Sequence, residues 1–166
     1  EEGAEKLVQA VEALWDVGIV VVTAAGNYGP RPGSITSPGI SKKVITVGSC
    51  DDQFYMEEGK KKRKSYSGRG PTAECVVKPD LLAPGSYITS CNARYREKGQ
   101  KPYTMKSGTS MSTPVVSGAI ALLLSKYPDM SNVEVKLRLR ESSIDIGRPQ
   151  NEQGWGLLNV EKLLKE

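Results

Sequence analysis

A run of β-branched residues that directly follows an amphipathic helix in the sequence most limits how this chain can fold. Residues 19–23 read Ile-Val-Val-Val-Thr, without alternation between apolar and polar side chains. A strand that is apolar on both faces is typical of a parallel sheet covered by helices. The preceding residues 4–17 place their apolar side chains on one helical stripe, and Gly18 stands where a helix ends. A helix followed by a buried strand is half of a βαβ unit, so we expect an α/β fold whose preceding strand lies outside these residues.

The other expected elements follow from the same patterns. Residues 24–39 are rich in glycine, proline and serine, which predicts a long ordered loop at the carboxyl end of the first strand, a common place for a site. Ser131 and Glu134 have the spacing of a capping box, and Asn159 is expected to cap a last short helix. Neither repeats nor linkers are evident, so residues 1–166 predict one continuous unit without a second domain. Further strands are expected at 44–47 and 87–90, helices at 110–126 and 131–141, and a hairpin over 50–66.

The chain has no histidine among its 166 residues, which restricts its chemistry. No imidazole can act as a general base, and the usual zinc ligand sets are unavailable unless cysteine or carboxylate supplies them. The three cysteines, Cys50, Cys75 and Cys91, have no CxxC spacing, which argues against a disulfide framework and a structural zinc site. We expect them to be unpaired and buried, and unpaired cysteines favour a cytoplasmic location.

The net charge of +4 does not indicate a nucleic-acid binder. Five of the 23 basic residues form the run Lys60–Lys64, and the other 18 do not outnumber the 19 acidic residues. A surface that follows phosphates needs basic residues spread over one face, with aromatic residues for single strands. The run is expected to be the solvated tip of the hairpin, and any partner it contacts should be acidic. The longest apolar run, residues 119–124, is too short to span a membrane.

The segment 107–114, Ser-Gly-Thr-Ser-Met-Ser-Thr-Pro, sets a serine at the opening of an apolar helix. The first N–H groups of a helix lack partners within it, and the helix dipole favours negative charge there. This environment suits Ser110 as a nucleophile whose attack creates an oxyanion. The alternative is that Ser110 is only an N-cap. Lys106 lies four residues before Ser110 but forms no S-x-x-K dyad motif, and Asp80 is expected to have a packing or turn role.

A second candidate lies at the end of the first expected strand. Residues 23–27 read Thr-Ala-Ala-Gly-Asn. Small residues followed by glycine leave room for the backbone of a ligand, and Asn27 presents one amide donor. Taken alone, Asn27 is better explained as a loop residue that caps a turn.

Five motifs in this order resemble the subtilisin-like serine proteases. The likeness extends from the first helix to the Gly-Trp-Gly-Leu-Leu-Asn-Val segment at 154–160, which is nearly the whole chain. It implies a subtilisin-like three-layer α/β fold with a mostly parallel sheet, of which residues 1–166 are the C-terminal portion of one peptidase catalytic domain. The motifs are Val-Thr-Ala-Ala-Gly-Asn at 22–27, Val-Ile-Thr-Val-Gly at 44–48, Tyr-Ser-Gly-Arg-Gly-Pro at 66–71, Lys-Pro-Asp-Leu-Leu-Ala-Pro-Gly at 78–85 and the serine segment at 107–114.

The resemblance implies a role for each matching residue. Ser110 matches the nucleophile that attacks a peptide carbonyl, and Asn27 matches the side-chain donor that stabilises the oxyanion with the Ser110 N–H. Ala24, Ala25 and Gly26 match the strand end that lines the pocket for the substrate side chain before the cleaved bond. Such a protease needs no cofactor for its chemistry, although structural calcium is common in the family.

The resemblance also implies that this chain is incomplete. The aspartate and histidine of the family precede the asparagine and serine in the chain, so the N-terminal half of the domain should supply them. Val115 stands where the family often has another histidine. These 166 residues alone are therefore expected to be inactive on a polypeptide, and their open sheet edge is expected to promote self-association. The alternative is a pseudoprotease or peptide-binding module that has lost its base.

Overall fold

A short parallel sheet forms the centre of the molecule. The computed structural model describes residues 2–54 and 65–165. The sheet has the order β1-β2-β3, with β1 at Val22–Ala24, β2 at Ile45–Ser49 and β3 at Leu81–Ala83. All three strands are parallel, as the unalternating β-branched run predicted. Their carboxyl ends therefore meet at one edge of the sheet.

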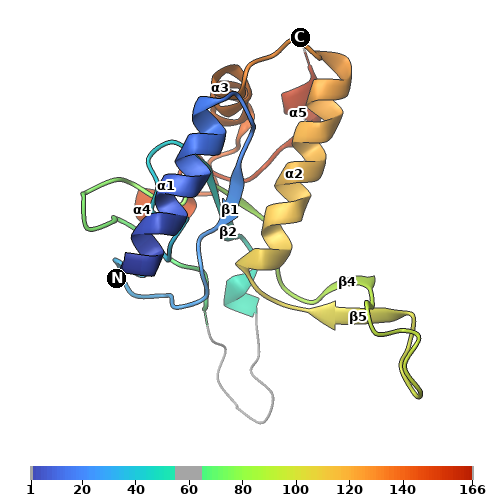
Figure 1. Cartoon of the computed structure of the whole chain (residues 1–166). Helices are drawn as coiled ribbons and strands as arrows, with labels where there is room; N and C mark the ends of the chain where they lie inside the picture. The colour runs from blue at the N-terminus through green and yellow to red at the C-terminus, as the bar shows by residue number, and fades with distance from the viewer. Residues whose placement is uncertain (1, 55–64, 166) are drawn as a thin grey trace.

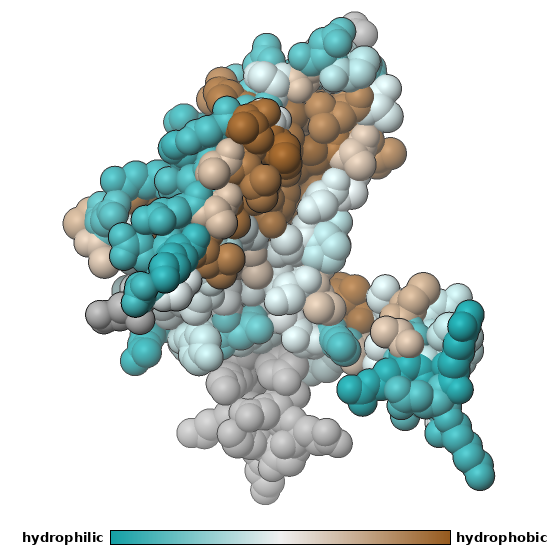
Figure 2. All heavy atoms as spheres, in the orientation of Figure 1, coloured by the Kyte–Doolittle hydropathy of each residue, from teal (hydrophilic) through white to brown (hydrophobic). Residues whose placement is uncertain are grey.

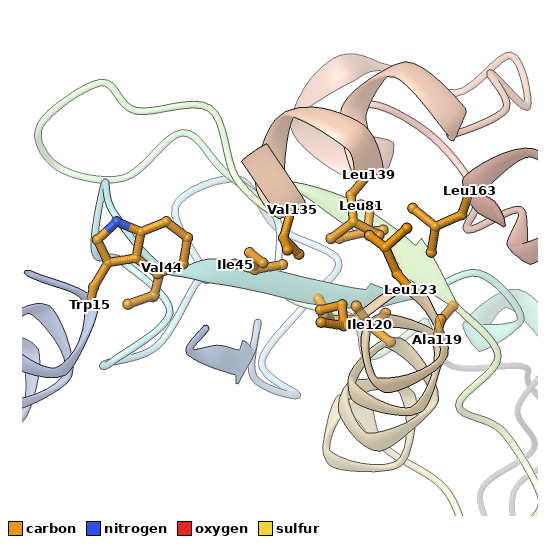
Figure 3. Packing of buried hydrophobic residues seen from close by; sticks show 13 residues of the cluster. Trp15, Val44, Ile45, Leu81, Ala119, Ile120, Leu123, Val135, Leu139 and Leu163 are labelled. Atoms are coloured by element: carbon orange, nitrogen blue, oxygen red, sulfur yellow. The ribbon is translucent and has the colours of Figure 1, made fainter. Parts of the chain in front are cut away.

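Helices cover both faces of this sheet, which gives the expected three layers. Helix α1 spans Glu2–Asp16, α2 spans Thr109–Lys126 and α3 spans Asn132–Ser142. Figure 3 shows apolar side chains of α3 on one side of β2 and those of α2 on the other. The predicted stripe of α2 is buried at Val116, Ala119, Ile120 and Leu123. This observation confirms an α/β fold with a mostly parallel sheet.

The short helices and caps follow local sequence signals. Helix α4 spans Gln150–Gln153 and α5 spans Val160–Leu164, and a single 3₁₀ turn, η1, spans Asp52–Phe54. The capping box predicted at the start of α3 is present, and Asn159 Oδ1 accepts a hydrogen bond from the Lys162 N–H at 2.7 Å. These caps satisfy N–H groups that have no partner within the helix.

A two-stranded antiparallel hairpin projects from the body of the molecule beside the start of α2 (Figure 1). Its strands are β4 at Ile88–Cys91 and β5 at Tyr103–Lys106. Strand β4 was predicted, but β5 was not, because the sequence Tyr-Thr-Met-Lys is short and mostly exposed. Strand β3 was also missed, since only three residues behind a proline form it.

Two predictions about burial are wrong. Strand β1 is only half-buried at Val22 and Ala24, because β1 is an edge strand and the surface beside it is open. Cys75 and Cys91 are exposed and Cys50 is partly buried, although all three are free as expected. Cys75 lies in a turn, and Cys91 lies on the projecting hairpin, so neither has a layer above it. The Lys60–Lys64 run lies outside the described residues.

Asp80 has the packing role that was expected of it. Its Oδ2 atom accepts hydrogen bonds from the Lys78 ammonium at 2.6 Å and from the Thr46 N–H at 2.7 Å. The side chains of Lys78 and Asp80, which form this ion pair, are both buried. Burial lowers the pKa of Lys78, and the charge of Asp80 opposes that shift. Asp80 therefore ties β2 to the start of β3 rather than facing a ligand. Within the described residues, the structure has no helix that could span a membrane.

Candidate active site

Ser110 lies in the first turn of α2, which follows the hairpin in the chain. Gly108 is the N-cap, with φ 150°, and its N–H donates to the Gly85 carbonyl at 2.9 Å. Ser110 follows two residues later and is exposed. The alternative of Ser110 as the N-cap is therefore wrong. The backbone N–H of Ser110 is one of the first N–H groups of the helix, which have no partner within it. This N–H is therefore available to an oxyanion.

Thr109 connects this helix start to Asn27, which is 82 residues away in the sequence. The Thr109 N–H and hydroxyl both donate to Asn27 Oδ1, at 2.9 and 3.1 Å. The same hydroxyl accepts a hydrogen bond from the Gly26 N–H at 3.1 Å. Thr109 is completely buried. The two candidates from distant motifs thus lie side by side, joined by a residue that sequence reasoning did not single out.

The contacts with Thr109 also fix which way the Asn27 amide points. Because Oδ1 accepts two hydrogen bonds from Thr109, the Nδ2 group must point away from that residue. A Cβ atom built on Gly108 would lie 3.1 Å from Asn27 Nδ2. The glycine thus leaves open the space in front of this donor, beside the exposed Ser110. An oxygen atom placed there could accept from both the side-chain amide and the backbone N–H.

The three small residues before Asn27 occupy the end of β1. Ala24 is half-buried and ends the strand, and Gly26 is half-buried with φ 93°. Ala25 is completely buried, and its carbonyl accepts from the Thr36 N–H at 3.0 Å. Ala24 and Gly26 are thus the members of this segment with accessible surface for a substrate.

A glycine loop supports the start of α2 from below. A Cβ atom on Gly85 would lie 2.2 Å from Ser112 Oγ and 2.9 Å from the Gly108 carbonyl oxygen, so only glycine allows this approach. Asp51 holds the loop by accepting from the N–H groups of Gly85 and Ser86, both at 2.9 Å. Burial would raise the pKa of Asp51, but these hydrogen bonds and one from Ser49 outweigh it and lower the pKa.

In the described residues, an exposed serine hydroxyl and two N–H donors lie at this helix start, but no base contacts the hydroxyl. No hydrogen bond to the Ser110 hydroxyl occurs within residues 2–54 and 65–165. In the same ranges, no group of three His, Cys, Asp or Glu side chains could hold a metal ion. A serine hydroxyl is a weak nucleophile until an adjacent base accepts its proton. The geometry would allow an oxyanion to be held near Ser110, and activation of the hydroxyl would need another group.

Comparison with known protein families distinguishes a site for acyl transfer from a chance arrangement of the same groups. Residues 1–156 match the family described as the subtilase family, peptidase S8. The chain belongs to the subtilase family. The resemblance inferred from five motifs is thereby confirmed.

Individual subtilases match this chain along nearly its whole length. Serine protease AprX from Bacillus subtilis is 43% identical over 170 residues, covering 96% of this chain and 38% of AprX. Subtilisin DY from Bacillus licheniformis is 37% identical, covering 96% of this chain and 52% of that protein. A psychrophilic protease of known structure superimposes with a TM-score of 0.72 at 28% identity, covering 92% of this chain and 52% of its own. The chain spans about half the length, or less, of these relatives.

Proposed function

We propose that this chain is the C-terminal portion of the catalytic domain of a subtilisin-like serine endopeptidase. Ser110 is the nucleophile: its Oγ forms a bond to the scissile carbonyl carbon, and its proton passes to a histidine base. The carbonyl electron pair becomes an oxyanion, which accepts hydrogen bonds from Asn27 Nδ2 and the Ser110 N–H. Collapse of the oxyanion expels the leaving amine, which takes the proton from the base, and water then hydrolyses the acyl-enzyme. The observation that carries this proposal is the bridge through Thr109, which sets the Asn27 amide beside an exposed serine at a helix start.

The histidine and its orienting aspartate are proposed to come from the N-terminal half of the same catalytic domain. The chain itself contains no histidine, so the base must lie outside these residues. A surface suited to receive that half lies beside β1, the edge strand. Figure 2 shows apolar side chains gathered between α1 and α2 on this face. They line a cavity of about 470 Å³ that includes Val20, Val22, Ile120 and Leu124. Such an exposed apolar area next to an open strand edge favours association.

The proposed chemistry needs only protein groups and a polypeptide substrate, with no cofactor. Ala24 and Gly26 are proposed to line the pocket for the side chain before the cleaved bond, with Ala25 supporting them from the core. Without the base and its carboxylate, a subtilase keeps only a small part of its rate. The 166 residues alone are therefore proposed to be inactive.

A fluorophosphonate probe applied to the full-length protein tests this function. The probe reacts with a serine hydroxyl that a neighbouring base has activated, so labelling should occur at Ser110 and disappear in Ser110→Ala. The matched control is Ser125→Ala, which removes an exposed hydroxyl about four turns further along α2, outside the cavity beside β1. Absent labelling, together with intact binding of peptides, would instead establish the pseudoprotease or peptide-binding alternative.

A further inference from the structure

A groove lies between the hairpin and the first turns of α2, and Met111, the residue after Ser110, is part of its lining. Its volume is about 710 Å³, and its lining includes Met111 and Pro114 of α2 together with Ile88 and Lys106 of the hairpin. The antiparallel register pairs Ile88 with Lys106 and Ser90 with Thr104, and these four side chains share the face that borders the groove. One face of the hairpin thus forms a wall of the groove.

The groove and the end of β1 lie on opposite sides of Ser110. Gly26 and Asn27 reach the helix through Thr109, which precedes the serine, whereas Met111 and Pro114, which follow it, border the groove. Figure 1 shows the hairpin extending away from α2 on the side opposite β1. Under the proposed function, the substrate side chain before the cleaved bond lies at the β1 end. The substrate residues after that bond must then continue along the groove.

The groove is lined by cations without a balancing anion. Arg94 and Lys106 line it, and no Asp or Glu of residues 2–54 and 65–165 is among its lining residues. Neither cation forms an ion pair within the described part of the chain. The sequence from 88 to 106 as a whole contains five basic residues and a single acidic one, Glu97. A cleft with walls of one sign concentrates the field and attracts the opposite charge.

We infer that Arg94 and Lys106 select polypeptides with acidic side chains on the carboxyl-terminal side of the cleaved bond. The inference rests on the proposed function for the direction of the substrate. The apolar contacts of Ile88 and Met111 hold the extended chain, and the two cations pair with carboxylates two or three residues beyond the bond. The Lys106 ammonium and the Arg94 guanidinium also repel lysine and arginine at the same substrate positions. Acidic peptides are therefore distinguished from basic ones by repulsion as well as by attraction.

Binding to the full-length Ser110→Ala protein tests the inference separately from catalysis. Two fluorescent peptides are compared that are identical before the intended bond and carry either Glu-Glu or Lys-Lys at the second and third positions after it. An exposed ion pair changes an equilibrium by about 1.4- to fivefold, so two attractive and two repulsive contacts together should favour the Glu peptide by about fourfold or more at low salt. The preference should fall sharply in 0.5 M NaCl, roughly where the Debye length drops below 5 Å.

Charge reversal at the groove distinguishes a local effect from the charge of the whole protein. Arg94→Glu combined with Lys106→Glu should reverse the preference, whereas Arg140→Glu, an exposed cation on α3, should leave it unchanged. Equal affinity for both peptides, or an equal shift in the Arg140→Glu control, would overturn the inference. If fluorophosphonate labelling of the unmutated protein fails while the Glu preference is present, the groove assignment stands and only the proposed hydrolysis is lost.

Discussion

Replacement of Thr109 by valine removes the hydroxyl that links the helix of Ser110 to Asn27, the proposed oxyanion donor, and keeps the side-chain shape. The variant loses the hydrogen bond to Asn27 Oδ1 at 3.1 Å and the acceptor of the Gly26 N–H at 3.1 Å. The bond from the Thr109 N–H to Asn27 Oδ1, at 2.9 Å, remains. Asn27 should therefore stay at the site but with its amide less firmly oriented.

The structure gives separate magnitudes for catalysis and stability. A neutral hydrogen bond contributes a net of about 1 kcal/mol. If the poorer orientation of the donor costs the transition state the same free energy, kcat falls by about fivefold. Complete removal of the donor by Asn27→Ala sets the upper limit, about 10²- to 10³-fold, a range already established for a subtilisin and taken over here unchanged. The unpaired Gly26 N–H should lower the free energy of unfolding by about 1–3 kcal/mol.

A double-mutant cycle on the full-length protein measures whether Thr109 acts through Asn27 in the proposed hydrolysis. The rate constant kcat is compared for the unmutated enzyme, Thr109→Val, Asn27→Ala and the double variant. Thr109→Val should cost about fivefold in the unmutated enzyme and almost nothing when Asn27 is already alanine. Thr113→Val is the matched control, because its hydroxyl bonds only to the Thr109 carbonyl within α2.

The reasoning fails if Thr109→Val lowers kcat by the same factor in both backgrounds. That result would mean that Thr109 supports the helix start in general and does not orient the amide. A change in KM alone, with kcat unaltered, would equally refute the role in transition-state stabilisation.

Three further predictions concern the site and the core. Gly108→Ala should lower kcat by at least tenfold in peptide hydrolysis, because its Cβ would lie 3.1 Å from Asn27 Nδ2 at a backbone φ of 150°, and unchanged kcat would refute the oxyanion space assigned there. Asp80→Ala should lower the free energy of unfolding in urea by about 3–5 kcal/mol, since it leaves the Lys78 ammonium buried without an anion, and a loss below about 1 kcal/mol would contradict this. Burial lowers the pKa of Lys136 from 10.5 to about 8, so the folded state releases its proton first and the unfolding free energy should rise between pH 8 and 9 by up to about 1.4 kcal/mol. Lys136→Met should flatten that rise. Above pH 9 a second group acts in the opposite direction: burial raises the pKa of Cys50 from 9.0 to about 11, so its ionisation favours the unfolded state.

Self-association of the isolated 166 residues is a separate prediction from the open face beside β1. Light scattering should show a mass that increases with concentration in the micromolar range, because the apolar cavity lined by Val20 and Leu124 is exposed next to a strand edge. Leu124→Glu should reduce the association, whereas Leu137→Glu, an exposed leucine on α3, should not. A monomer over the whole range would contradict this interpretation.

The elements that the sequence predicts well are those whose signal is contained within one segment. The unalternating run at 19–23 indicated a parallel sheet, and the serine at an apolar helix start and the asparagine behind a buried strand indicated both candidate site residues. The role of Thr109 could not be read in this way, because it depends on the approach of two segments 82 residues apart. The cations of the groove were missed for the same reason: only the pairing of β4 with β5 places Lys106 beside Ile88. Burial of the cysteines was wrong because a residue type does not reveal whether another layer covers it.

The hairpin is anchored at its base, immediately before Ser110 in the chain. The Tyr87 N–H donates to Ser107 Oγ at 2.8 Å, and the Gly108 N–H donates to the Gly85 carbonyl at 2.9 Å, so both arms are joined below β4 and β5. Changes beyond this anchor need not displace Ser110. The hairpin is therefore a segment that mutation, insertion or exchange between relatives can alter independently. Under the proposed function, new substrate preferences can then arise in evolution or by grafting while Ser110 and Asn27 stay in place.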